Sequence, residues 1–300
     1  MFKLYIYNLN ILNKMLLETP FLNASGCNCT NGDELEIIDN CEFTGGCVSK
    51  SSTVLPRDGN LGKRYYDNEM GSINSMGIPN LGYQYYLNYS NNRLIDKPFI
   101  QSIAPLCIQD LEIMLTYICL YNTKSNYYIE LNLSCPNVEK SSPIGYDFKN
   151  FDKYLEIADK VLKDKIEYGI KLPPYFTNEQ FNQVANIIRI HNVSFLTCIN
   201  SIPNCLIHDN NKSVIEPNNG FGGLGGHYCK PIGLANVKQF HDRLDITIIG
   251  CGGIYSGQDV MDYLNCGATY FQIGTYFKIN GIEVFEKIYQ EFTQLKNNRL

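Results

Sequence analysis

The chain has 300 residues, of which 44% are hydrophobic and 18% charged, and 25 Lys and Arg against 30 Asp and Glu give a formal net charge of −5. This composition excludes a disordered or collagen-like chain, and the acidic balance argues against a nucleic-acid binder, which needs clustered positive charge. No segment approaches the roughly 20 clean apolar residues of a membrane span, and residues 1–21 lack the apolar core of a signal peptide. We therefore expect a cytoplasmic protein that binds neither nucleic acid nor a membrane.

Eight short runs of β-branched or apolar residues recur along the chain, and most are followed by Gly, Ser, Asn or Cys, which suit strand ends. The predicted strands are Phe21–Ala24, Cys47–Ser49, Pro98–Ile103, Tyr128–Leu133, Tyr168–Leu172, Phe195–Ile199, Thr247–Ile249 and Tyr270–Ile273. Helical periodicity predicts helices over Asp33–Asp39, Asp110–Tyr121, Asp152–Leu162, Glu179–Ile190, Asn236–Leu244, Gly257–Leu264 and Glu283–Leu295. Asp110, Asp152 and Thr177 are the predicted N-caps.

Alternation of strands and helices predicts an α/β fold, a single (β/α)8 TIM barrel over residues 1–300. The alternative is an open doubly wound sheet, which would normally carry G-x-G-x-x-G after its first strand, and that fingerprint is missing here. Two connections, 52–97 and 200–230, are long and irregular. Insertions after barrel strands build active sites, so we expect both to lie over the C-terminal mouth.

The most informative strand end reads Asn132-Leu133-Ser134-Cys135-Pro136-Asn137. Pro136 cannot continue a ladder, so the chain must leave the sheet there. The amides of Asn132 and Asn137 suit a ring that bears amide or imide groups. Cys135 could act as a nucleophile or a base, although a Cys at a strand end is often only structural.

Two lysines stand at other strand ends. Lys171 is flanked by apolar strand residues, and Lys50 lies beside hydroxyl-bearing residues. A buried ammonium needs a partner. Lys171 therefore meets an anion or an electron-rich ring, or else it forms a salt bridge with a carboxylate inside the barrel.

Glycine turns follow the last two predicted strands, at Gly252-Gly253 and Gly274-Thr275. Backbone N–H groups in such turns bind phosphate, and barrels often hold a phosphate after strands seven and eight. The segment Gly220–Gly226 is expected to be a loop that adds to this phosphate site. The polar segment 71–80 has the composition of a substrate loop, and Asn200 and Ser201 add hydrogen-bonding groups at the mouth.

Cysteine and histidine spacing gives no metal-site pattern. The 12 Cys contain no C-x-x-C pair, and His191, His208, His227 and His241 are scattered. We expect free thiols and no metal, because an even Cys count implies disulfides only in a secreted chain.

Together these motifs resemble the dihydroorotate dehydrogenase family, and within it the soluble, fumarate-using class 1A. The matching stretches follow the family's order nearly end to end; they are 23–26, 50–53, 74–77, 132–137, 171–174, 200–201, 222–226, 252–253 and 274–275. The resemblance implies an FMN-containing barrel that oxidises (S)-dihydroorotate to orotate in pyrimidine (UMP) biosynthesis. It also implies fumarate as electron acceptor, succinate as its product, and a homodimer.

The resemblance also implies residue roles, with Cys135 as the catalytic base. The FMN contacts would be Ala24, Ser25, Gly26, Lys50, Ser51, Asn132, Lys171, Ile199, Gly226, Gly252, Gly253, Gly274 and Thr275. The substrate contacts would be Lys50, Asn74, Ser75, Met76, Gly77, Ile78, Asn132, Asn137, Asn200 and Ser201.

Three alternatives remain at this point. An NAD-linked class 1B enzyme would work with an iron–sulfur flavoprotein subunit. A tRNA dihydrouridine synthase would also use FMN and a loop Cys, but it needs a basic RNA-binding surface. A catalytically idle FMN-binding protein would bind flavin without turning over dihydroorotate.

Overall fold

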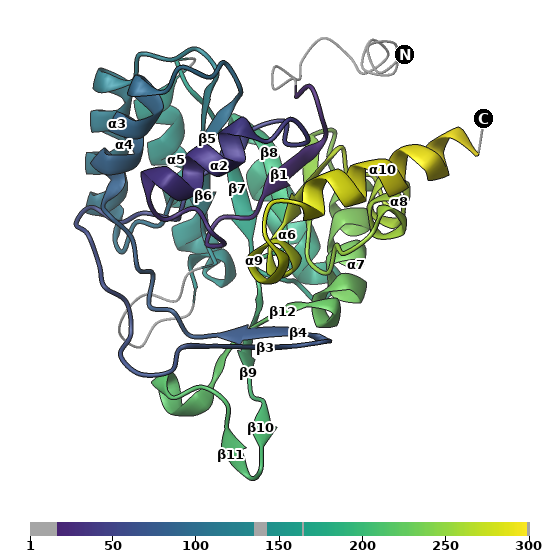
Figure 1. The fold of residues 1–300 in the computed structure, drawn as a ribbon. Coiled ribbons are helices and arrows are strands. Elements are labelled where there is room, and N and C mark those ends of the chain that lie inside the picture. Colours follow the sequence, from purple (N-terminus) through teal and green to yellow (C-terminus); the bar gives the residue numbers. More distant parts are fainter. Residues whose placement is uncertain (1–16, 135–142, 164, 299–300) are drawn as a thin grey trace.

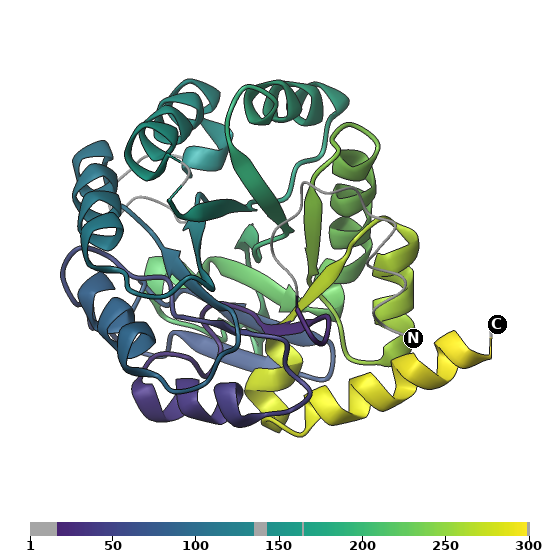
Figure 2. The ribbon, with the colours of Figure 1, turned by 90° about the horizontal axis from the view of Figure 1, so that it is seen from above.

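Eight parallel strands form the barrel in the computed structural model, which describes residues 17–134, 143–163 and 165–298. The sheet runs in the order β1-β14-β13-β8-β7-β6-β5-β2, and helices surround it in Figure 2. Each strand overlaps a predicted one: β1 (Phe21–Asn23), β2 (Cys47–Val48), β5 (Phe99–Ile103), β6 (Tyr127–Asn132), β7 (Glu167–Leu172), β8 (Val193–Cys198), β13 (Thr247–Cys251) and β14 (Tyr270–Ile273). The predicted TIM barrel is confirmed, and the open doubly wound sheet is wrong.

A side chain joins the two ends of this sheet. The Asn23 amide on β1 donates to the carbonyl of Val48 at 2.7 Å, and its oxygen accepts from the Val48 N–H at 2.8 Å. Asn23 is fully buried. Its amide offers the same donor and acceptor as a backbone peptide. It therefore links β1 to β2, two of the described strands that no backbone ladder pairs with each other.

The barrel interior changes from apolar to polar along the strands. An apolar cluster fills the part nearer the strand N-termini; it comprises Leu17, Leu22, Val48, Ile100, Tyr128, Phe195, Ile249 and Tyr270. Side chains on a strand alternate between its faces, so the residues two positions further along also face inward. On four of these strands they are polar and buried: Ser102, Glu130, Thr197 and Gln272. Polar chemistry therefore begins inside the barrel, beneath its C-terminal mouth.

All seven predicted helices are present, packed outside the strands over a large apolar core. They are α2 (Gly32–Asn40), α4 (Ile108–Tyr121), α5 (Phe148–Leu162), α6 (Asn178–Ile188), α7 (Lys230–His241), α8 (Gly257–Asn265) and α10 (Val284–Asn297). Two further helices were not predicted, α3 (Tyr83–Asn92) and α9 (Thr275–Asn280). None of the helices in the described ranges combines the length and apolarity needed to cross a bilayer.

One predicted N-cap is confirmed and two are wrong. Thr177 caps α6 in a capping box with Gln180. Helix α4 begins before Asp110, whose carboxylate instead accepts from the N–H of Leu106. Helix α5 is capped by Asp147, and Asp152 lies in the helix body.

The two long connections meet at the C-terminal end of the barrel (Figure 1). They contribute β3 (Tyr65–Asn68), β4 (Gly71–Asn74), β9 (Ile202–Cys205) and β12 (Gly222–Gly226) to an antiparallel sheet in the order β3-β4-β12-β9. The hairpin β10 (His208–Asp209) and β11 (Lys212–Ser213) extends beyond this sheet. The described residues also contain three 3-10 turns, η1 (Ile144–Tyr146), η2 (Pro217–Gly220) and η3 (His227–Cys229).

The expectation that the glycine-rich stretch is a loop is wrong, because most of it is strand β12, paired with β4 and β9. Its glycines permit close approach between strands. At Gly226, φ is +80°, and an added Cβ would lie 2.3 Å from the Cα of Gly71. The local sequence alone could not predict this strand, because its partners β4 and β9 are separate segments of the chain.

Candidate active site

A cavity of about 1030 Å³ lies between the barrel mouth and the antiparallel sheet. Every predicted site residue in the described part of the chain lines it: Ala24, Ser25, Gly26, Lys50, Ser51, Asn74, Ser75, Met76, Gly77, Ile78, Asn132, Lys171, Ile199, Asn200, Ser201, Gly226, Gly252, Gly253, Gly274 and Thr275. The other two predicted residues, Cys135 and Asn137, lie outside the described residues. Motifs spread from residue 24 to residue 275 thus converge on one cavity.

Amides and hydroxyls form a connected network across one side of this cavity. Asn132 Nδ2 donates to Ser51 Oγ at 3.0 Å, and Asn132 Oδ1 accepts from Asn200 Nδ2 at 3.1 Å. Ser51 Oγ also lies 3.0 Å from Ser25 Oγ and 2.8 Å from Ser102 Oγ. These bonds fix the orientation of both amides, and each Nδ2 group keeps a second hydrogen that can donate to a ligand.

Lys171 is the most buried cation of the cavity wall. Its side chain is on β7, the residue is 4% exposed, and its Nζ donates to Gln272 Oε1 at 2.7 Å. Gln272 Nε2 in turn donates to Glu130 Oε2 at 2.8 Å. The alternative of a direct salt bridge is therefore wrong in detail, since an amide stands between the ammonium and the barrel carboxylate.

The glycine turns also line the cavity, beside β4 and β12. Gly253 has φ +68°, and an added Cβ there would lie 2.9 Å from the carbonyl oxygen of Gly226. Ser72 Oγ on β4 is 3.0 Å from Thr275 Oγ1, at the start of α9. Hydroxyls and backbone N–H groups at such turns are donors that suit an anion.

Several residues of the cavity wall were not predicted from the sequence: Cys27, Arg57, Tyr65, Cys229, Cys251, Tyr255 and Lys278. Tyr65 and Lys278 come from distant segments, yet the Lys278 Nζ lies 5.0 Å from the centre of the Tyr65 ring. No local pattern marks such a pair. Only Arg57 and Lys278 in this set could have been suspected from the sequence, because they are cations near predicted strand ends or turns.

The described thiols of the cavity are poor bases. Burial raises the pKa of Cys27 and Cys251, and it raises the pKa of Cys229 to about 12. A neutral thiol does not accept a proton readily at pH 7. Among the cavity cysteines, the described three are therefore unsuited to proton abstraction.

The cavity fits a phosphate-bearing cofactor with a planar ring. The hydroxyl of Tyr255 is buried without a hydrogen-bond partner among the described residues, beside the glycine turns. Burying a hydroxyl without a hydrogen-bond partner is costly, so we expect a bound ligand to form a hydrogen bond with the Tyr255 hydroxyl. The two buried lysines, Lys50 and Lys171, supply positive charge that suits an electron-rich ring or an anion.

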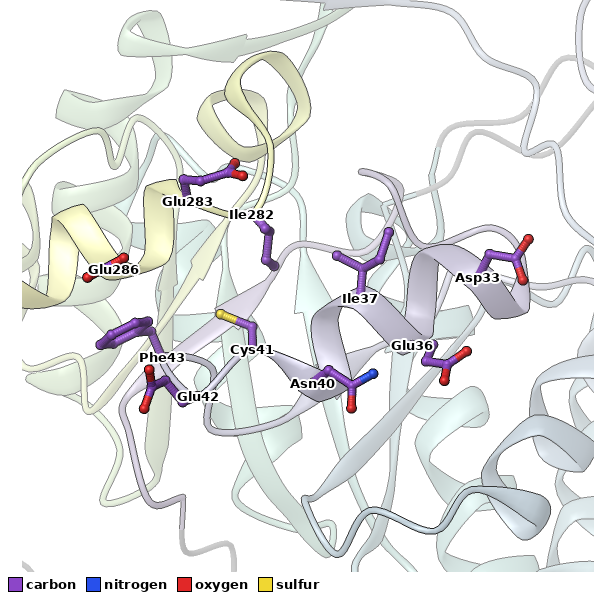
Figure 3. A pocket seen from close by; sticks show the side chains of 10 residues that line it. All are labelled: Asp33, Glu36, Ile37, Asn40, Cys41, Glu42, Phe43, Ile282, Glu283 and Glu286. Carbon is purple, nitrogen blue, oxygen red and sulfur yellow. The ribbon is translucent and has the colours of Figure 1, made fainter.

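A second hollow, of about 760 Å³, lies on the outside of the barrel between α2 and α10 (Figure 3). Its side chains include five carboxylates and no Lys or Arg: Asp33, Glu36, Glu42, Glu283 and Glu286. This charge repels anions such as phosphates and carboxylates. The site for an anionic ligand is therefore the cavity at the barrel mouth.

Comparison with known proteins gives a consistent family. The family model for dihydroorotate dehydrogenase matches residues 8–295. The chain is 40% identical to dihydroorotate dehydrogenase (fumarate) of Lachancea kluyveri, over 97% of this chain and 93% of the relative. It is 42% identical to the protein of the same name from Saccharomyces paradoxus, over 93% of this chain and 90% of the relative.

A structural comparison agrees at the level of the fold. The crystal structure of DHODH from Eimeria tenella in complex with ferulenol matches with a TM-score of 0.77 and 16% sequence identity, covering 96% of this chain and 84% of that chain. The chain belongs to the dihydroorotate dehydrogenase family.

Proposed function

We propose that this protein oxidises (S)-dihydroorotate to orotate and passes the electrons to fumarate, using bound FMN. One observation carries the proposal: the residues matched to the family's cofactor and substrate contacts line one continuous cavity. The two relatives described above, both named dihydroorotate dehydrogenase (fumarate), support the same acceptor.

The chain's own groups suit this reaction. Lys50, Lys171 and the glycine turns would hold the cofactor, and FMN, when bound, supplies a hydride acceptor. The fixed amides of Asn132 and Asn200 would orient the substrate ring, with Asn74, Ser201 and Asn137 completing its contacts. Close orientation of reacting groups is a large source of rate enhancement.

Cys135 is our proposed general base, which would take the proton from the substrate carbon next to the carbonyl group. Burial keeps the three described cavity thiols protonated, so they do not compete for this role. A thiolate base loses activity as pH falls, because the ordinary pKa of a Cys thiol is about 8.5.

Fumarate would enter the cavity after orotate leaves, since one site serves both half-reactions. A steady-state assay with dihydroorotate tests this, comparing fumarate, NAD and a quinone as acceptors. Of the three acceptors, we expect only fumarate to support oxidation of dihydroorotate. Double-reciprocal plots at several fixed fumarate concentrations should give parallel lines. Activity only with NAD and an added iron–sulfur subunit would instead favour the class 1B alternative.

The purified protein should be yellow and contain one FMN per chain. Finding FAD, or no flavin after reconstitution, would contradict the cofactor assignment. A yellow protein without turnover on dihydroorotate would favour the idle FMN-binding alternative. The cytoplasmic location stays a prediction from the sequence, and the homodimer stays a prediction of the resemblance.

A further inference from the structure

Glu130 is a fully buried carboxyl group inside the barrel. It lies on β6 and is 0% exposed. Its Oε2 accepts hydrogen bonds from Thr197 Oγ1 and Gln272 Nε2, both at 2.8 Å, whereas Oε1 has no partner among the described residues. Burying a carboxyl group with an unused oxygen is costly, so a compensating charge must stand nearby.

The positive charge nearest to Glu130 in this network is Lys171, and the side-chain amide of Gln272 connects the two. Lys171 Nζ donates to Gln272 Oε1 at 2.7 Å, and the other end of the same amide donates to Glu130. An ammonium can only donate, and an ionised carboxylate can only accept. The amide of Gln272 is therefore held in one orientation, with its oxygen toward Lys171 and its nitrogen toward Glu130.

Among the described residues, the other groups that raise the pKa of Lys171 are thiols. Burial by itself would lower the pKa of Lys171, but the pKa is raised by its neighbours, which are Cys251 on β13, Glu130 on β6, and Cys27 and Cys29 beyond β1. Burial raises the pKa of all three thiols, so they are neutral at pH 7. Lys50 and Lys278, which also face Cys27, are cations. Glu130 is thus the one carboxyl group among these neighbours of Lys171.

We propose that Glu130 is a positioning residue for the reaction: through Gln272 it fixes the ammonium of Lys171 and keeps it protonated at the cofactor site. The inference rests on the proposed function, because it assigns Lys171 to the flavin. Its consequence is that a negative charge developing on the cofactor meets a lysine that already carries its proton.

The test is a reductive titration of the bound flavin in the holoenzyme, with the midpoint potential measured from pH 7.5 to 9. In the unchanged protein we expect the midpoint potential to fall with rising pH, at a slope that corresponds to one proton per two electrons. In Glu130→Gln, Lys171 loses its anion and gives up its proton in the oxidised enzyme. Reduction then returns this proton, so the slope should approach two protons per two electrons, about twice the original.

Two further variants separate charge from structure. Thr197→Val removes one hydrogen bond from the same carboxylate oxygen without changing any charge, so its slope should stay at one proton. The double variant Glu130→Gln/Gln272→Glu moves the carboxylate directly against Lys171 and should also keep one proton. If Glu130→Gln alone fails to fold, a doubled slope in this double variant would still overturn the inference.

An unchanged slope in flavin-loaded Glu130→Gln would overturn the inference, and so would a doubled slope in Thr197→Val or in the double variant. None of these results would affect the proposed function. If the unchanged protein bound no flavin, the proposed function would fail, and the inference with it.

Discussion

Asn23 shows how one side chain can replace a missing stretch of β-ladder. Its amide bonds to both backbone groups of Val48, between the first and last strands of the sheet order. The sequence motif that contains Asn23 was predicted as a strand end beside the cofactor. Its bridging role could not be predicted, because it depends on a partner 25 residues away in the chain.

Asn23→Ala should therefore lower the free energy of unfolding by about 2–6 kcal/mol, since it leaves two buried backbone groups unpaired at roughly 1–3 kcal/mol each. Urea denaturation followed by circular dichroism measures this change. The matched control is Asn265→Ala, at an exposed position on α8, which should change stability by less than about 0.5 kcal/mol. Equal effects at the two positions would contradict the bridging role.

Cys135 was identified from its motif alone, and it lies outside the described residues. Cys135→Ser should retain FMN and bind orotate, but it should slow flavin reduction by dihydroorotate about 100-fold or more at pH 7, since general bases contribute about 10²–10⁴. Anaerobic stopped-flow absorbance measures the rate. Cys266→Ser, at the end of α8 and away from the cavity, should reduce at the original rate. An unchanged rate in Cys135→Ser would show that another group is the base.

At the scale of elements, local sequence was a good guide to the barrel and a poor guide to the insertions. The strands and amphipathic helices of the barrel follow periodic patterns over a few residues, and their ends were predicted to within about six positions, the largest difference being the start of α7 (Lys230, predicted at Asn236). The sheet over the mouth depends on pairing between β4 and β12, which lie about 150 residues apart. The buried Glu130 was likewise hidden in a strand that reads as apolar.

Two carboxylates on α8, Asp259 and Asp262, bind the ammonium of Lys230 at the start of α7. Asp259 binds the ammonium of Lys230 and also accepts from Ser256 Oγ and the Tyr255 N–H, at 2.8 and 2.9 Å. Burial opposes the charged form of Asp259, but these donors outweigh burial and hold the pKa of Asp259 below its ordinary 3.8. A depressed pKa means that this stabilisation is present above about pH 4 and is lost as pH falls through the lower pKa of the folded state.

Asp259→Asn should therefore be less stable than the unchanged protein, by about 1–3 kcal/mol at pH 7. The difference should stay constant between pH 8 and pH 5 and shrink below about pH 4. Urea midpoints across this range give the comparison. The control Asp245→Asn, at an exposed position, should change stability at pH 7 by less than about 0.5 kcal/mol. A difference that grows on acidification would show that the ionised carboxylate of Asp259 does not stabilise the fold.

At the scale of the whole molecule, the resemblance predicts a homodimer. A closed two-fold assembly is the commonest arrangement among homo-oligomers, and the sheet and hairpin beyond the barrel extend the chain where a second copy could pack. Light scattering coupled to size-exclusion chromatography should give twice the monomer mass of 34.2 kDa. A mass of one chain at micromolar concentration would contradict this prediction, and would leave the cavity assignment untouched.

We propose that one cavity at the barrel mouth serves both halves of an electron transfer from dihydroorotate to fumarate. The most direct measurement follows the visible absorbance of the bound flavin without oxygen. Dihydroorotate should bleach the flavin band in the absence of any second protein, and fumarate added afterwards should restore it, with orotate and succinate formed in equal amounts. A flavin that dihydroorotate does not bleach, or that fumarate does not restore, would contradict the account.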